Sequence, residues 1–370
     1  LGRRFSSRRV ALAALWLTAI HPYHLWYSQE VRMYSLGAGL GLLCLWAAGP
    51  FWQESRPSRR GLLLYAAAAA AGLYTLYYFA FLLVGLNLAV LWVNRHKVLR
   101  LGGWLGANLA GLLLWLPWLP VFWRQMTDPP VPPWRGALSL ATVAQESLAT
   151  LLVGQSPPLG LLWPWAGLAG LLLVALFRPR RAPRSGEGAL LAGFVFLPLL
   201  LILLISLTAT PLYHIRYFFT YAAAGTLLLA LAVDRLANHR RWLHAVLFGA
   251  LLAASGWGLH EFWTNPLYRA DDHRGAVAEL AARWRPGDAV LVNAGWAYTA
   301  LAVYWPPAAT PSGAQPAAPP VRLRLIDYAQ TDTPTEPQRP LILLGGSVDG
   351  SPRMGWGLAE SDFYAINQAE

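Results

Sequence analysis

Two short polar segments stand out in an otherwise apolar chain, because they hold residues that could do chemistry. The first runs from His21 to Ser35 and contains Glu30 and Arg32 between aromatic residues. A carboxylate can ligate a hard cation or accept a proton, and the planar fork of an arginine fits a phosphate. The alternative is a plain Glu30–Arg32 ion pair in the aromatic belt of a membrane surface.

The second segment, residues 208–218, contains His214, Arg216 and Tyr217. Arg216 is again an isolated arginine beside aromatic residues. Together, Arg32 and Arg216 favour one anionic ligand held at one face of a membrane. The alternative is that each arginine only anchors its helix in the lipid interface.

The remaining candidates are weaker. Asp128 and Glu146 belong to a long proline-rich stretch, residues 124–158, and are interpreted as solvated loop charges. Asp271 and Asp272 lie at the start of a predicted helix, where paired acids cap the helix and match its dipole. Cys44 is the only cysteine, so the chain has no disulfide and no thiolate metal site.

Composition defines the class of protein that must position these residues. Of the 370 residues, 56% are hydrophobic and only 13% are charged, whereas a soluble domain carries about 25% charged residues. This excludes a soluble enzyme, a disordered chain and a disulfide scaffold. The net charge of +11 comes almost entirely from arginine, which we interpret as compositional bias rather than nucleic-acid binding. The chain is predicted to be a polytopic α-helical membrane protein.

Nine apolar stretches approach the length of about 20 residues that a spanning helix needs. They cover residues 9–27, 33–51, 61–76, 78–94, 101–123, 159–177, 188–208, 217–236 and 242–261. The third and fourth form one continuous apolar stretch. We divide it at Thr75–Tyr78, where an aromatic cluster indicates a membrane interface.

Basic residues test this division. With the first four arginines placed in the cytoplasm, alternating loops put 17 basic residues inside and four outside, as the positive-inside rule requires. The four outer residues are Arg32, Arg124, Arg135 and Arg216. Merging the third and fourth spans would destroy the alternation at every later loop.

The composition changes after residue 261. Residues 262–370 hold eight basic and 11 acidic residues, many prolines and no apolar span. Helices are predicted at 271–285 and 298–305, and strands at 288–292, 321–328 and 341–344. We therefore expect two domains: a transmembrane domain, residues 1–261, and a small extracytoplasmic α/β domain, residues 262–370.

The segment Tyr27–Leu36, preceded by a basic loop and one span, resembles a hallmark stretch of family 39-type bacterial glycosyltransferases. These are membrane enzymes of the GT-C fold, akin to protein O-mannosyltransferases and the lipid A aminoarabinose transferase. Weaker agreement continues at residues 74–79, 214–217 and 274–291, so the resemblance covers most of residues 1–300.

The resemblance implies transfer of a sugar from a polyprenyl-phosphate donor to a lipid, glycan or protein acceptor at the outer face of a bacterial plasma membrane. It implies that Glu30 helps to hold a divalent metal or the donor phosphate. Arg32 and Arg216, with His214 and Tyr217, would bind that phosphate. The catalytic acid of such enzymes lies in the first outer loop, which we expect upstream of Leu1, in a part of the protein that this chain lacks.

Two other functions remain open. A transporter or flippase of a lipid-linked anion would use the same outer arginines, but it favours charges or prolines in mid-span, and these are almost absent. A non-catalytic membrane scaffold that presents residues 262–370 to a partner is the third interpretation.

Overall fold

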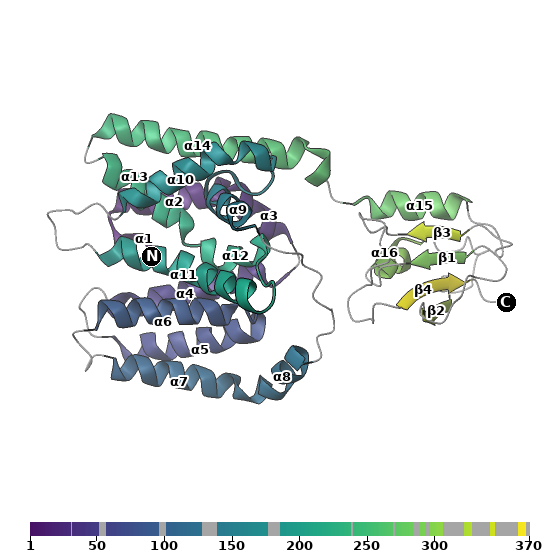
Figure 1. Ribbon diagram of the computed structural model, residues 1–370, viewed down its shortest axis with the longest axis horizontal. Helices are drawn as coiled ribbons and strands as arrows, with labels where there is room; N and C mark the ends of the chain where they lie inside the picture. The colour runs from purple at the N-terminus through teal and green to yellow at the C-terminus, as the bar shows by residue number, and fades with distance from the viewer. Residues whose placement is uncertain are drawn as a thin grey trace, which may run out of the picture. The chain divides into compact units, whose positions relative to one another are not determined.

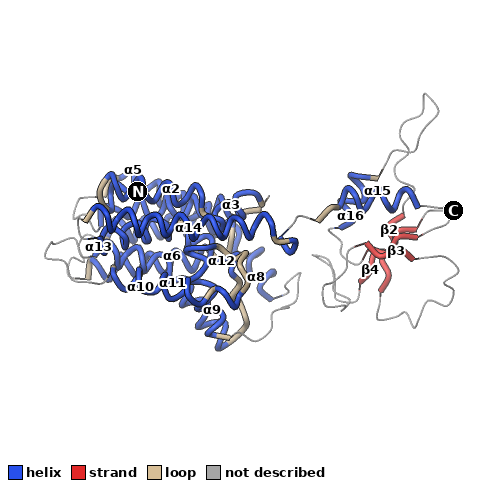
Figure 2. Tube along the Cα trace, turned by 90° about the horizontal axis from the view of Figure 1, so that it is seen from above, coloured by secondary structure: helices blue, strands red, loops and turns tan. Residues whose placement is uncertain are grey.

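The computed structural model describes residues 1–30, 32–51, 57–95, 101–127, 139–176, 186–237, 240–268, 271–283, 289–292, 297–305, 322–327, 341–344 and 362–367. The chain divides into two compact units: residues 1–120 with 135–269, and residues 121–134 with 270–370. The first unit is helical, and the second contains the strands (Figures 1 and 2).

The helices of the first part of the chain are α1 (Gly2–Phe5), α2 (Arg8–Ile20), α3 (Pro22–Gln29), α4 (Tyr34–Ala48), α5 (Arg59–Thr75), α6 (Phe79–Val93), α7 (Gly102–Trp115), α8 (Leu119–Thr127), α9 (Leu140–Val153), α10 (Trp163–Ala175), α11 (Gly186–Thr208), α12 (Ile215–Ala222), α13 (Gly225–Ala237) and α14 (Arg241–Thr264). Serine side chains cap the N-terminal ends of several of these helices. Ser7, Ser58 and Ser139 cap α2, α5 and α9 by accepting hydrogen bonds from backbone N–H groups in the first turn.

The predicted division of the stretch 61–94 is confirmed. Helix α5 ends at Thr75, the backbone at Leu76 is extended, and α6 begins at Phe79. The Phe79 ring lies against Gly72, in the space that a Cβ atom would fill. A larger residue at position 72 would push the two helices apart at this break.

Two predicted elements differ in the structure. The predicted span 9–27 is two helices, α2 and α3, because Pro22 lacks an N–H group and forces His21 out of the helical conformation. The stretch 124–158, interpreted as a loop, contains the helix α9. Its 14 residues extend about 21 Å, and it is one of three shorter apolar helices in the described part of the chain, with α6 and α10.

Four helices in the described part of the chain are long and apolar enough to span a membrane: Tyr34–Phe51, Gly102–Thr127, Leu190–Thr208 and Arg241–Thr264. A fifth span arises if α12 and α13, which are bent by 61° at a short break, are counted as one. Large apolar side chains of these helices are exposed, as expected for contact with lipid. The structure is that of an α-helical membrane protein.

A polar cluster joins α5, α6 and α7 inside the first unit. The Asn87 amide donates to Asn108 Oδ1 at 2.9 Å and accepts from Trp104 Nε1 at 2.6 Å, and the Tyr65 hydroxyl donates to Asn108 Oδ1 at 2.7 Å. Interhelical hydrogen bonds of this kind hold membrane helices together without a hydrophobic driving force.

The second unit contains α15 (His273–Arg283), β1 (Ala289–Val292), α16 (Ala297–Tyr304), β2 (Arg322–Asp327), β3 (Leu341–Leu344) and β4 (Asp362–Asn367). The strand order is β2-β4-β1-β3, with β1 parallel to β3 and β4 antiparallel to both of its neighbours. Asp272 caps α15 by accepting from Gly275 N at 2.8 Å, as predicted.

Candidate functional site

Tyr34 brings the two predicted phosphate-binding arginines together. It is the first residue of α4 and is 1% exposed. Its hydroxyl lies close enough to the side chains of Arg216 and Arg32 for both guanidinium groups to act on it electrostatically. Two arginines 184 positions apart in the sequence therefore act on one hydroxyl group.

Tyr217 supports this arrangement from α12. Its ring stacks on Tyr78 with centroids 4.0 Å apart, and it meets the Tyr34 ring edge-on at 6.3 Å. His214 precedes the helix and caps it, because its Nδ1 accepts the Arg216 backbone N–H at 3.2 Å. The structure thus gives His214 a local role in starting α12, in addition to its predicted place beside the phosphate.

Glu30 ends α3, and its carboxylate accepts a hydrogen bond from Trp26 Nε1 at 3.0 Å. Among the residues that the structure describes, no group of three or more His, Cys, Asp and Glu side chains could hold a metal ion.

Aromatic side chains seat α3 against α12. The rings of Tyr23 and Tyr27 lie 5.1 Å apart, and Tyr27 also contacts Phe219 at 5.1 Å. The Tyr23 hydroxyl donates to the Ile215 carbonyl at 2.5 Å, and the Tyr27 hydroxyl donates to Gln155 Oε1 at 3.2 Å. These contacts fix the first turn of α12, which carries Arg216.

Glu146 is a residue of this region that the sequence analysis missed. Its interpretation as a solvated loop charge is wrong, because α9 turns it inward and its Oε2 accepts a hydrogen bond from the Tyr213 hydroxyl at 3.0 Å. Burial raises the pKa of the Glu146 carboxyl above its usual value, with the Tyr213 hydrogen bond opposing the shift. The signal in the sequence was Ser139, a helix-capping residue followed by 14 residues without Gly or Pro. Asp128 lies outside the described residues.

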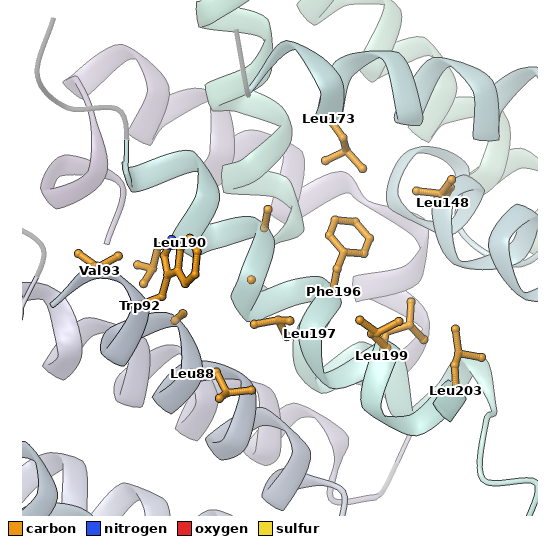
Figure 3. Close-up of a pocket in the computed structure, with 14 residues that line it drawn as sticks. Leu88, Trp92, Val93, Leu148, Leu173, Leu190, Phe196, Leu197, Leu199 and Leu203 are labelled. Atoms are coloured by element: carbon orange, nitrogen blue, oxygen red, sulfur yellow. The ribbon is translucent and has the colours of Figure 1, made fainter. Parts of the chain in front are cut away.

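A cavity of about 800 Å³ opens along α11 in the same unit. Figure 3 shows Phe196, Leu197 and Leu199 of α11, with Leu88 of α6 and Leu148 of α9, around it. All 14 lining residues are apolar or aromatic. Leu148 belongs to α9, the helix that also carries Glu146.

No protein-family model, curated protein or solved structure matches the chain. The resemblance to glycosyltransferases therefore stays a prediction from the sequence. The structure brings Arg32, Arg216 and Tyr217 together around Tyr34. It keeps Glu30 on the adjacent helix α3, within electrostatic range of Tyr27.

Proposed function

We propose that the chain binds a polyprenyl phosphate at the outer face of the membrane and serves the transfer of its sugar to a lipid, glycan or protein acceptor. The observation that carries this proposal is that the first turn of α12, with Arg216 and Tyr217, packs on Tyr34 through the Tyr217 ring, and that Arg32 acts electrostatically on the same tyrosine. Two guanidinium groups beside one neutral hydrogen-bonding group form a site that favours a phosphate over a neutral ligand.

The N-terminus of α12 adds to the positive potential around Arg216. Arg216 is the second residue of α12, a half-helix bent by 61° from its continuation. The N-terminus of a helix carries a partial positive charge, and broken membrane helices direct such ends at anionic groups. The backbone and the guanidinium of Arg216 thus favour the same sign of ligand charge.

The apolar cavity supports a lipid-linked ligand. Its lining on α11 runs from Leu190 to Leu203, about 20 Å of helix. A hydrocarbon chain fits such a lining, because no charged side chain takes part in it. Ser206, one turn beyond Leu203, already contacts the polar segment that leads to Arg216.

The chemistry requires two operations. The bond between the sugar and the phosphate breaks more easily when arginines neutralise the charge of the leaving phosphate. The acceptor hydroxyl must lose a proton to a base as the new glycosidic bond forms. Arg32 and Arg216 serve the first operation. Because the described residues offer no metal ligand set, we derive no step through a metal.

The same proposal includes the membrane arrangement. Nine spans in a bacterial plasma membrane, with residues 262–370 forming an extracytoplasmic α/β domain, would place Arg32 and Arg216 at the outer surface. The charge distribution of the loops supports this orientation.

Binding of undecaprenyl phosphate to the purified chain in nanodiscs tests the proposal, with the neutral undecaprenol as the reference ligand. We expect Arg216→Ala to weaken phosphate binding by at least tenfold and Arg216→Lys to recover part of it, since lysine keeps the charge but loses the fork. Arg60→Ala is the matched control, because Arg60 is exposed in the first turn of α5, a helix that contributes no lining residue to the cavity. Equal affinity for phosphate and alcohol would refute the proposal.

A flippase of a lipid-linked anion is the second candidate, and the bent pair α12–α13 favours it, since broken helices are typical of transporters. The two functions differ in an assay with vesicles that contain the protein and a polyprenyl-phosphate sugar. A flippase moves the donor between leaflets without consuming it, whereas a transferase releases polyprenyl phosphate only when an acceptor is present.

A further inference from the structure

Residues 209–214, which we call the strap, connect α11 to α12 and are held by hydroxyl groups from other elements. Ser206 Oγ accepts hydrogen bonds from the backbone N–H groups of Leu212 and Tyr213, at 3.0 and 3.1 Å. The hydroxyl of Tyr78, the residue before α6, donates to the Leu212 carbonyl at 2.7 Å. The backbone of the strap therefore lacks the freedom of an ordinary surface loop.

The Tyr213 side chain bonds the strap to α9. Its hydroxyl donates to Glu146 Oε2 at 3.0 Å and lies 3.1 Å from Ser147 Oγ. Tyr213 is 6% exposed and Ser147 is 1% exposed, so water does not compete effectively for these partners.

The strap also determines where Arg216 lies. His214, its last residue, caps α12 by accepting the Arg216 backbone N–H. Tyr213 and His214 are adjacent in the chain, so a displacement of the Tyr213 ring moves the cap and the first turn of α12. This turn carries the guanidinium that acts electrostatically on Tyr34.

We propose that Glu146 is a positioning residue for the anion site: by holding Tyr213, it fixes the strap and thereby the position of Arg216. The inference rests on the proposed function for the identity of the ligand. Glu146 does not contact that ligand. Its contribution is the geometry of the acceptor oxygen rather than its negative charge.

Three substitutions test this geometry. Glu146→Ala removes the acceptor and Tyr213→Phe removes the donor, and each is expected to weaken undecaprenyl phosphate binding about tenfold, or about 1.4 kcal/mol. The double variant is expected to lose no more than either single variant, because both remove the same bond. Glu146→Gln keeps an oxygen acceptor and is expected to stay within about threefold of the wild type.

Hydrogen exchange provides a readout that needs no ligand. The amides of Leu212, Tyr213 and Arg216 are bonded to side chains, so their exchange is expected to accelerate in Glu146→Ala and Tyr213→Phe but not in Glu146→Gln. Glu261→Ala is the matched control for the loss of a partly buried outer carboxylate, and it is expected to change neither exchange nor binding.

The possible failures are distinguishable. Unchanged exchange in Glu146→Ala overturns the inference even when phosphate binding is normal. A Glu146→Gln variant as weak as Glu146→Ala also overturns it, because the charge and not the geometry would then matter. A wild type that binds no polyprenyl phosphate refutes the proposed function, and with it the ligand role of Glu146, while the exchange pattern still reports whether Glu146 holds the strap.

Discussion

Replacement of Gly258 with alanine is expected to separate three helices that together seat the site. Gly258 lies in α14, where an added Cβ would overlap the carbonyl oxygen of Val153 and approach the Pro22 ring to 2.8 Å. Val153 ends α9 and Pro22 begins α3. The obstructing carbonyl belongs to the backbone, so no change of rotamer relieves the overlap. Gly154 follows with φ of 74°, a conformation that favours glycine, and it too lies against Pro22.

The magnitude follows from two opposing effects. Alanine in place of glycine stabilises a helix interior by up to about 1 kcal/mol, whereas overpacking costs about 1–3 kcal/mol. Gly256 and Gly249 lie on the same helix with no atom within 4 Å of an added Cβ, so their alanine variants show the first effect alone. Because the Gly258 overlap involves backbone, we take the upper cost, which places Gly258→Ala about 3 kcal/mol below Gly256→Ala.

Thermal unfolding in detergent, followed by tryptophan fluorescence, measures this difference. For a unit of roughly 250 residues, 1 kcal/mol corresponds to about 2–4 °C, so the two variants should differ by about 6–12 °C. A Gly258→Ala variant that unfolds at the same temperature as Gly256→Ala would show that α14 does not touch α9 at this residue, and it would refute the packing described here. The same variant is also expected to weaken polyprenyl phosphate binding, because α3 carries Tyr27 beside the site.

Three other predictions concern stability and topology. Burial raises the pKa of the Glu146 carboxyl above its usual value of 4.5, so just above pH 4.5 the folded chain holds a proton that the unfolded chain releases. The wild type should therefore lose stability relative to Glu146→Gln as the pH rises from 4.5 through the pKa of the folded state. Parallel profiles of stability against pH for the two proteins would contradict this. Asn87→Leu removes the bond to Asn108 and should cost about 1–2 kcal/mol in the same unfolding assay, and an unchanged transition would show that the cluster contributes nothing. Ser28→Cys should react with a membrane-impermeant maleimide in intact cells and Ser58→Cys only after lysis, while the buried native cysteine stays unreactive; the reverse pattern would invert the proposed orientation.

The sequence predicted those parts of the fold that depend on local signals. The break between α5 and α6 was visible because aromatic residues gather at Thr75–Tyr78 and because the loop charges alternate only if the chain turns there. The break at Pro22 could also be predicted from the sequence, because proline has no backbone N–H and interrupts a helix. The prediction there followed the length of the apolar stretch instead of the proline, and it therefore gave one span where the structure has two helices.

The candidate site was predicted only in part, because its bonds join distant residues. Arg32 and Arg216 were found as isolated charges, but nothing in the sequence indicated that Tyr34 joins them. Glu146 and Tyr213 lie 67 positions apart, and a glutamate in a proline-rich stretch has the composition of a loop. A hydroxyl that bonds a backbone carbonyl, as Tyr23 does at Ile215, leaves no trace in composition or periodicity.

The difference in burial between α13 and α7 determines which helices meet lipid. Ten of the 13 residues of α13 are buried by other helices, whereas only 11% of the best apolar window of the segment Gly102–Thr127 is buried. A photoreactive hydrocarbon dissolved in the bilayer would therefore label α7 heavily and α13 weakly, although both helices consist mostly of apolar residues. In chemical footprinting of this protein, protection of an apolar helix would report a protein neighbour, not exclusion from the membrane.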